Sequence, residues 1–185
     1  MPAAQFPRGG VVTPATTPID PRIAAAWAVL DHVPDPEVPV ISLTELGIVR
    51  DVQADGAGLR VTLTPTYSGC PATEMIERDV ADALRGAGFG PVAIVRQRAP
   101  AWTTDWISAA GRQKLRDYGI APPGPVDPAH GVALRFMPRT SAVALICPHC
   151  GNGRTERLAA FGSTACKALH RCLACGEPFE HFKPI

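Results

Sequence analysis

The sequence lacks both a long apolar run and a strong excess of one charge. No uninterrupted apolar stretch reaches about 18 residues, the length that a membrane-spanning helix needs. Basic and acidic residues nearly balance, 18 against 17, so the chain has no basic surplus for binding nucleic acid through bulk charge. The first residues also lack the apolar core of a secretory signal peptide. We therefore expect a cytoplasmic protein that binds neither a membrane nor nucleic acid.

Proline, by contrast, is abundant and unevenly distributed. It accounts for 20 of the 185 residues, about twice its usual ~5% share. Residues 1–20 and 121–140 are rich in proline and show no hydrophobic period. This composition predicts a flexible tail over the first segment and a stiff linker over the second. Residues 21–120 then form one domain, and residues 141–185 form a C-terminal module.

Within residues 21–120, the hydrophobic pattern changes between helical and strand periods. Apolar residues at helical spacing predict helices, and alternating apolar residues predict strands. The predicted helices span 21–30, 72–84 and 106–118, and the predicted strands span 48–54, 59–65 and 92–97. This order predicts an α+β fold, a small two-layer domain with a core of its own.

The segment between the first helix and the first strand is irregular. Three prolines interrupt residues 31–40 and exclude both a helix and a central strand. Ser42 and Glu45 have the spacing of a capping box, and Gly47 is expected to end the short turn that they begin. The carboxylates of Asp35 and Glu37 lie in the proline-rich part, where they would orient a metal or a partner. The alternative is that both are ordinary solvated side chains.

Cysteine is concentrated at the C-terminal end, where five of the six cysteines occupy the last 39 residues. Four of them form two C-x-x-C pairs, each followed by glycine: Cys147 with Cys150, and Cys172 with Cys175. Such pairs in a cytoplasmic chain indicate metal binding rather than disulfides. Four thiolates make the closed tetrahedral site typical of structural zinc. Iron also suits these ligands, so it remains an alternative.

The metal has a structural task in this prediction. The C-terminal module is too short to bury a sufficient core, and a bound metal would hold it together as a zinc ribbon. Cys166 lies between the two pairs, beside Lys167. We interpret Cys166 first as a small packed residue, and the alternative is an additional, exchangeable thiol.

Cys70 is the one cysteine of the first domain. Because Pro71 suits the first position of a helix, the pattern predicts Cys70 as the N-cap of the second helix. A thiol there has its pKa lowered by the positive end of the helix dipole. The resulting thiolate would serve as a nucleophile or as a ligand for a soft metal. The alternative is a small buried residue at a strand–helix junction.

Several short motifs of the first domain occur in the order found in one known family. They are Asp35-Pro36-Glu37-Val38-Pro39, Leu46-Gly47-Ile48-Val49, Thr64-Pro65-Thr66 with Gly69-Cys70-Pro71, and Pro100-Ala101-Trp102. On these motifs, residues 22–119 resemble the SufT-like family of iron–sulfur assembly proteins. Residues 161–169 and 177–183 resemble the C-terminus of the PaaD-like family, accessory subunits of bacterial phenylacetyl-CoA epoxidase systems.

The resemblance implies a site and a set of partners. It implies that Cys70 handles iron or an iron–sulfur cluster transiently, with Asp35 and Glu37 at the same site. The implied partners are the epoxidase oxygenase, which uses a di-iron centre, and the reductase, which carries an iron–sulfur cluster and flavin. We therefore expect a non-catalytic accessory protein that aids maturation of one of these centres in phenylacetate catabolism.

Two other functions remain as alternatives. The first is a structural subunit that docks on the oxygenase without transferring metal. The second is an enzyme with Cys70 as nucleophile, which is disfavoured because the sequence places no histidine near Cys70 to act as a base.

Overall fold

The computed structural model of the protein describes residues 20–67, 69–124 and 145–185. All but the last residue of the predicted tail (1–20) and most of the predicted linker (121–140) lie outside these ranges. The elements in chain order are α1 (Pro21–Leu30), β1 (Val49–Asp55), β2 (Gly58–Leu63), α2 (Thr73–Gly86), β3 (Val92–Arg96), η1 (Thr104–Trp106), α3 (Ala109–Asp117), β4 (Ile120–Ala121), β5 (Thr155–Ala159), β6 (Lys167–Cys172) and β7 (Pro178–Phe182). No helix of the described ranges is long and apolar enough to cross a membrane.

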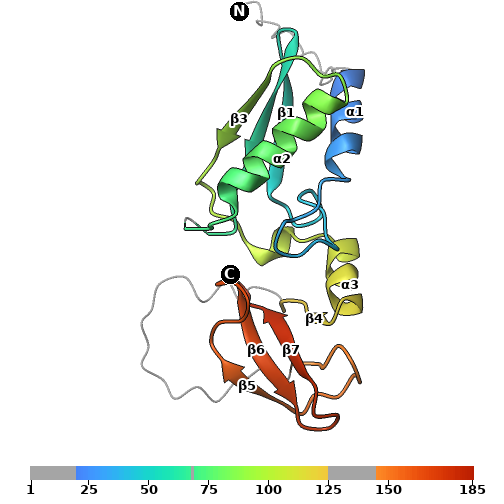
Figure 1. Cartoon of the computed structure of the whole chain (residues 1–185), viewed down its shortest axis with the longest axis vertical. Coiled ribbons are helices and arrows are strands. Elements are labelled where there is room, and N and C mark those ends of the chain that lie inside the picture. The colour runs from blue at the N-terminus through green and yellow to red at the C-terminus, as the bar shows by residue number, and fades with distance from the viewer. Residues whose placement is uncertain (1–19, 68, 125–144) are drawn as a thin grey trace, which may run out of the picture.

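The N-terminal part is a three-stranded sheet covered by helices, in agreement with the predicted α+β fold (Figure 1). β1 and β2 form an antiparallel hairpin, and β3 pairs parallel to β2 after the α2 crossover. α1 packs against β1 and α2, while α2 also packs against β3. The core between these layers is fully closed, since Leu30, Val61, Val80 and Leu84 have no exposed surface.

The C-terminal part is a second sheet with the strand order β4-β7-β6-β5. β5, β6 and β7 form an antiparallel meander, and the short strand β4 pairs parallel to β7. Ala121 therefore lies in a strand, although the proline pattern assigned it to the linker. The reason is burial, because Ala121 is 2% exposed and packs with Cys147, Cys172 and Phe179. The rest of the predicted linker stays a prediction.

The third predicted helix begins later than its sequence suggested. Residues 104–106 form the 3-10 turn η1, and the chain is then extended at Ile107 before α3 starts. Ser108 is the N-cap of α3, and its Oγ accepts a hydrogen bond of 2.9 Å from the amide of Gly111. The predicted start of this helix at residue 106 was wrong. The N-cap hydrogen bond of Ser108 fixes the start of α3 at Ala109, although the residues before it are partly apolar.

The two parts share a core rather than standing apart. Phe182 of β7 is 1% exposed and belongs to the hydrophobic cluster of the N-terminal part. Its ring centroid lies 6.0 Å from that of Trp102, whose Nε1 donates to the Leu46 carbonyl. The carbonyl of Ile185 accepts hydrogen bonds from the Thr103 hydroxyl (2.8 Å) and the Thr104 amide (3.1 Å), at the junction marked by the C-terminus in Figure 1.

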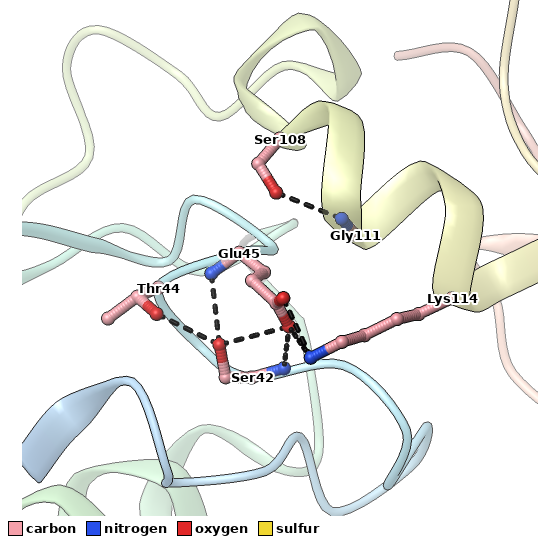
Figure 2. Close-up of polar contacts among 6 residues, drawn as sticks. All are labelled: Ser42, Thr44, Glu45, Ser108, Gly111 and Lys114. Atoms are coloured by element: carbon pink, nitrogen blue, oxygen red, sulfur yellow. Dashed lines mark hydrogen bonds and ion pairs between the residues drawn. The ribbon is translucent and has the colours of Figure 1, made fainter.

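The predicted capping box anchors the loop that precedes β1 (Figure 2). The Ser42 amide donates to the Glu45 carboxylate (3.0 Å), and the Glu45 amide donates to Ser42 Oγ (3.2 Å). Lys114 of α3 forms an ion pair of 2.7 Å with the same carboxylate. The Ser108 amide donates to the Glu45 carbonyl (2.8 Å). Glu45 thus ties the loop to the start of α3.

Gly47 ends this turn, as its sequence position predicts. Its φ of 77° lies in the left-handed region, and an added Cβ would lie 2.7 Å from Trp106 Cβ. Both the backbone conformation and the close approach therefore require glycine at this position. The contact also brings Trp106 under the guanidinium of Arg50, which lies 3.6 Å from the ring centroid.

The Glu45 contacts predict a pH-dependent loss of stability in Glu45→Gln. We expect the free energy of unfolding to fall by about 1–2 kcal/mol at neutral pH, because charged hydrogen bonds are lost. Burial raises the pKa of Glu45, but hydrogen bonds from Lys114 and Ser42 outweigh it and hold the pKa below its ordinary value of 4.5. The carboxylate's contribution is therefore present above this pH and lost as the pH falls.

Urea unfolding at a series of pH values measures the difference in the free energy of unfolding between wild type and Glu45→Gln. This difference should become smaller below about pH 4.5. Asp82→Asn is the control, because it removes only an exposed ion pair with Arg85. Its effect should not exceed about 0.5 kcal/mol. A Glu45→Gln difference that is constant with pH would contradict the assignment.

The shared core predicts that Phe182→Ala destabilises the whole molecule. Truncating a fully buried phenylalanine costs about 3–5 kcal/mol, and this side chain belongs to the core of the N-terminal part. Denaturant unfolding, followed by tryptophan fluorescence that includes Trp102, measures the loss in the free energy of unfolding. Phe161→Ala, at a side chain that is 65% exposed, is the matched control. An unchanged tryptophan transition would show that the parts are energetically independent.

Candidate functional site

The first site is the cluster of four cysteines at one end of the C-terminal sheet. The sulfur atoms of Cys147, Cys150, Cys172 and Cys175 all lie within 4.8 Å of one another. Two of these distances are 3.8 Å (Cys147 to Cys175) and 3.5 Å (Cys150 to Cys172). Sulfurs placed tetrahedrally about 2.3 Å from a zinc ion lie about 3.8 Å apart. The arrangement therefore fits a four-thiolate metal site.

Each C-x-x-C pair is shaped by a tight turn that ends on a glycine. The amides of Gly151 and Gly176 donate to the carbonyls of the first cysteine in each turn, at 2.9 and 3.0 Å. Both glycines have positive φ, 72° and 81°, a conformation that other residues adopt at a cost. The Ala174 amide faces the sulfur of Cys172 at 3.4 Å. Four thiolates leave no open coordination position, so the site is suited to structure rather than catalysis.

The second site is a small pocket between the N-terminal part and the C-terminal sheet. Its free space is about 10 Å³, close to what a single water needs. The residues lining it are Asp35, Glu37, Val38, Leu46, Ile48, Pro65, Thr66, Cys70, Ile76, Cys166 and Phe182. The structure thus brings together Asp35, Glu37 and Cys70, which the sequence analysis grouped in one site. It adds Cys166, which the sequence pattern favoured as a packing residue.

Asp35 shapes the loop that carries the carboxylates. It is 6% exposed, and its Oδ1 accepts hydrogen bonds from the amides of Glu37 (2.9 Å) and Val38 (2.8 Å). Burial raises the pKa of Asp35, and these amides and the nearby Lys167 offset part of the increase. Burial and the Asp35 charge likewise raise the pKa of Glu37, which is only partly buried. Asp35 therefore holds the loop, and Glu37 is left to face the pocket.

The predicted environment of Cys70 was wrong in two respects. α2 begins at Thr73 with Ala72 as its N-cap, so Cys70 lies in the turn before the helix. The Cys70 amide donates to the Tyr67 carbonyl, and the Cys70 carbonyl accepts from the Thr73 hydroxyl at 2.8 Å. The pKa of the thiol is raised, because burial and the nearby carboxylates outweigh the hydrogen bonds that favour thiolate.

Cys166 lies immediately before β6 and is 6% exposed. Its sulfur is in hydrogen-bond contact with the Thr164 hydroxyl at 3.0 Å. Burial raises the pKa of this thiol, and the Glu37 charge adds to the increase. Beside it, the nearly buried Lys167 ammonium pairs with Glu180 at 2.8 Å. The pocket therefore gathers acidic groups whose ionised forms are disfavoured unless a cation joins them.

Comparison with known proteins gives two family matches and one close relative. Residues 23–94 match the family described as iron-sulfur cluster assembly protein, and residues 135–183 match the PaaD zinc beta ribbon domain. The chain is 46% identical over 165 residues to an Escherichia coli (strain K12) protein named as a putative subunit of 1,2-phenylacetyl-CoA epoxidase. The alignment covers 89% of this chain and 94% of that protein.

Two solved structures are similar to the N-terminal part. One is a domain of unknown function, DUF59, from Bacillus anthracis, at 28% identity and a TM-score of 0.48, covering 51% of this chain and 92% of that one. The other is a Mycobacterium tuberculosis protein described as associated with Fe–S complex assembly and repair. Its identity is 31% and its TM-score 0.31, and the match covers 60% of this chain and 98% of that one.

The four-cysteine site predicts that Cys150→Ser loses the bound metal and unfolds β5–β7. Structural zinc sites contribute about 10–16 kcal/mol of apparent binding energy, more than a small module can replace. Metal content by native mass spectrometry and strand content by circular dichroism measure the two effects. Leu158→Ala is the control, because this side chain of β5 is 48% exposed and is no metal ligand. Freshly purified wild type without metal would contradict the prediction.

Proposed function

The chain belongs to the PaaD family of phenylacetyl-CoA epoxidase subunits, and we propose that it is an accessory protein that matures an iron centre of such an epoxidase. In this proposal its partners are the oxygenase and reductase components, and the iron or iron–sulfur cluster is cargo that it delivers. The chain performs no catalytic turnover of its own. The resident metal of the C-terminal sheet is zinc, held by the four cysteines in a structural role.

The observation that carries the proposal is the meeting of Asp35, Glu37 and Cys70 in one small pocket. Each of these groups has its pKa raised, because burial disfavours the charged form. A divalent cation reverses this penalty, since it favours ionised carboxylates and thiolates. A thiolate combined with carboxylates offers both soft and hard donors, a set that suits iron.

The raised thiol pKa also supports a carrier over an enzyme. A cysteine nucleophile needs a lowered pKa or an adjacent base, and burial raises the pKa of Cys70. No histidine is among the described residues that line the pocket. A thiol that loses its proton only when it binds metal gives a site from which the metal can dissociate again as the thiol is reprotonated.

Cys70→Ser tests the proposal in cells whose only copy of the gene carries the substitution. Serine preserves size and polarity but binds iron far less well than thiolate. We expect phenylacetyl-CoA epoxidation to be lost while the variant accumulates normally. Iron analysis of the purified oxygenase and reductase should show one of them in its metal-free form, which identifies the client.

Met75→Leu is the matched control, because this exposed sulfur side chain lies on α2, the helix that follows Cys70, and does not line the pocket. It should leave activity and iron content unchanged. Wild-type epoxidase activity in Cys70→Ser cells would reject the maturation role. Fixed-ratio copurification with a fully metallated oxygenase would then favour a docked structural role.

A further inference from the structure

We propose that Cys166 is the second thiolate of the Cys70 site, so that the two parts of the chain hold one Fe(II)-type divalent ion between Cys70, Cys166 and Glu37. This inference rests on the proposed function, because it specifies how the iron cargo is bound. It assigns a chemical role to a cysteine outside the four-cysteine cluster.

The position of Cys166 is the first support. Although the residue belongs to the C-terminal sheet region, it packs into the hydrophobic cluster of the N-terminal part. Its carbonyl accepts a hydrogen bond of 2.9 Å from the Lys183 amide, next to the buried Phe182. This backbone contact places the thiol in the wall of the pocket that also contains Cys70 and Glu37.

The segments that carry the donors support the grouping. Cys70 lies in a turn in which its amide donates to the Tyr67 carbonyl at 3.2 Å. Cys70, Glu37 and Cys166 come from three separate segments of the chain and line the same pocket. The fold therefore brings the three proposed ligands to one region.

The side-chain charges around the pocket leave room for a bound cation. None of the described residues that line the pocket is a lysine or an arginine, whereas two of them, Asp35 and Glu37, are acidic. The ammonium of Lys167, next to Cys166 in the chain, is paired with Glu180 at 2.8 Å. A divalent ion would place positive charge beside these acidic groups. Each thiol then releases its proton to solvent as its sulfur binds the metal.

The donor set and the available space favour one ion over a cluster. Two thiolates and a carboxylate suit Fe(II) or a similar divalent ion. The free space of about 10 Å³ corresponds to one water-sized particle. Asp35 is not counted as a ligand, because its Oδ1 already accepts two amide hydrogen bonds.

The donors line one pocket but are not assembled into a ligand set. Within the described ranges, the four-cysteine cluster is the one group with three or more ligand atoms within 4.8 Å of each other. Metal binding at the pocket must therefore rotate side chains, and the partly buried Glu37 and Cys70 are free enough to do so. A site that is completed only by its ion releases that ion readily, which a carrier requires.

Anaerobic titration of the zinc-loaded full chain with Co(II) tests the proposal. Co(II) stands in for Fe(II), and it does not displace the more tightly bound zinc from the four cysteines. Near-ultraviolet sulfur-to-cobalt absorption reports thiolate ligands, and proton release reports thiol ionisation. Wild type should bind one Co(II) per chain and release about two protons, because both thiols start protonated.

In Cys166→Ser, affinity should fall at least about 10-fold, because removing even a supporting neighbour of a ligand costs roughly 10–100-fold. Absorption per bound ion and proton release should each fall by about half. Cys166→Ala, which suits the buried position, gives the same test if serine impairs folding. Glu37→Gln should weaken binding without changing the absorption per ion, and Glu177→Gln, at an exposed position, is its matched control.

Wild-type Co(II) affinity and absorption in Cys166→Ser, combined with loss of binding in Cys70→Ser, would overturn the role of Cys166 and leave the proposed function in place. Absence of any Co(II) binding by the zinc-loaded wild type would overturn the Cys70 site, and with it the proposed function.

Discussion

Four thiolates share a small volume only when a cation offsets their repulsion, and much of the molecule depends on this constraint. The cysteine turns fix the ends of β6 and β7 nearest the metal. These strands carry Phe182 into the core of the N-terminal part, where it meets Trp102. The same strands set the backbone around Cys166, through the Lys183 amide. These strands thereby connect the four-cysteine cluster at one end of the sheet to the pocket at the other.

The two metal-related sites use cysteine in opposite ways. The C-terminal cluster has four thiolates, short sulfur–sulfur distances and backbone amides that face sulfur. These features favour a permanent, closed site. The pocket has two thiols with raised pKa, the buried Cys166 and the partly buried Cys70, with carboxylates nearby and no preassembled ligand set. These features favour an ion that enters and leaves. In the proposed function, four of the six cysteines hold the structural metal and the other two hold the cargo.

Local patterns predicted most of the fold. Asp20 and Pro21 start α1, Ser42 and Glu45 form their capping box, and the paired cysteines meet, because neighbours in sequence determine each of these features. The assignment of Ala121 to the linker and the predicted lowered pKa of Cys70 were wrong, because both depend on burial by distant residues. The location of Cys166 in the pocket was also not predictable from local sequence. It depends on the pairing of Lys167 in β6 with Phe182 in β7, which are 15 residues apart in the chain. The roles of Asp35, Glu37 and Cys70 stay predictions.

β6 runs from Lys167 to Cys172, about 20 Å at 3.3 Å per residue, with a cysteine of the four-cysteine cluster at one end and Cys166 just before the other. If both sites bind their metals as proposed, one short strand carries a ligand of the first and adjoins a ligand of the second. Any coupling between the two sites would then be reciprocal: a change in zinc occupancy that altered iron affinity would be matched by an equal effect of iron on zinc affinity.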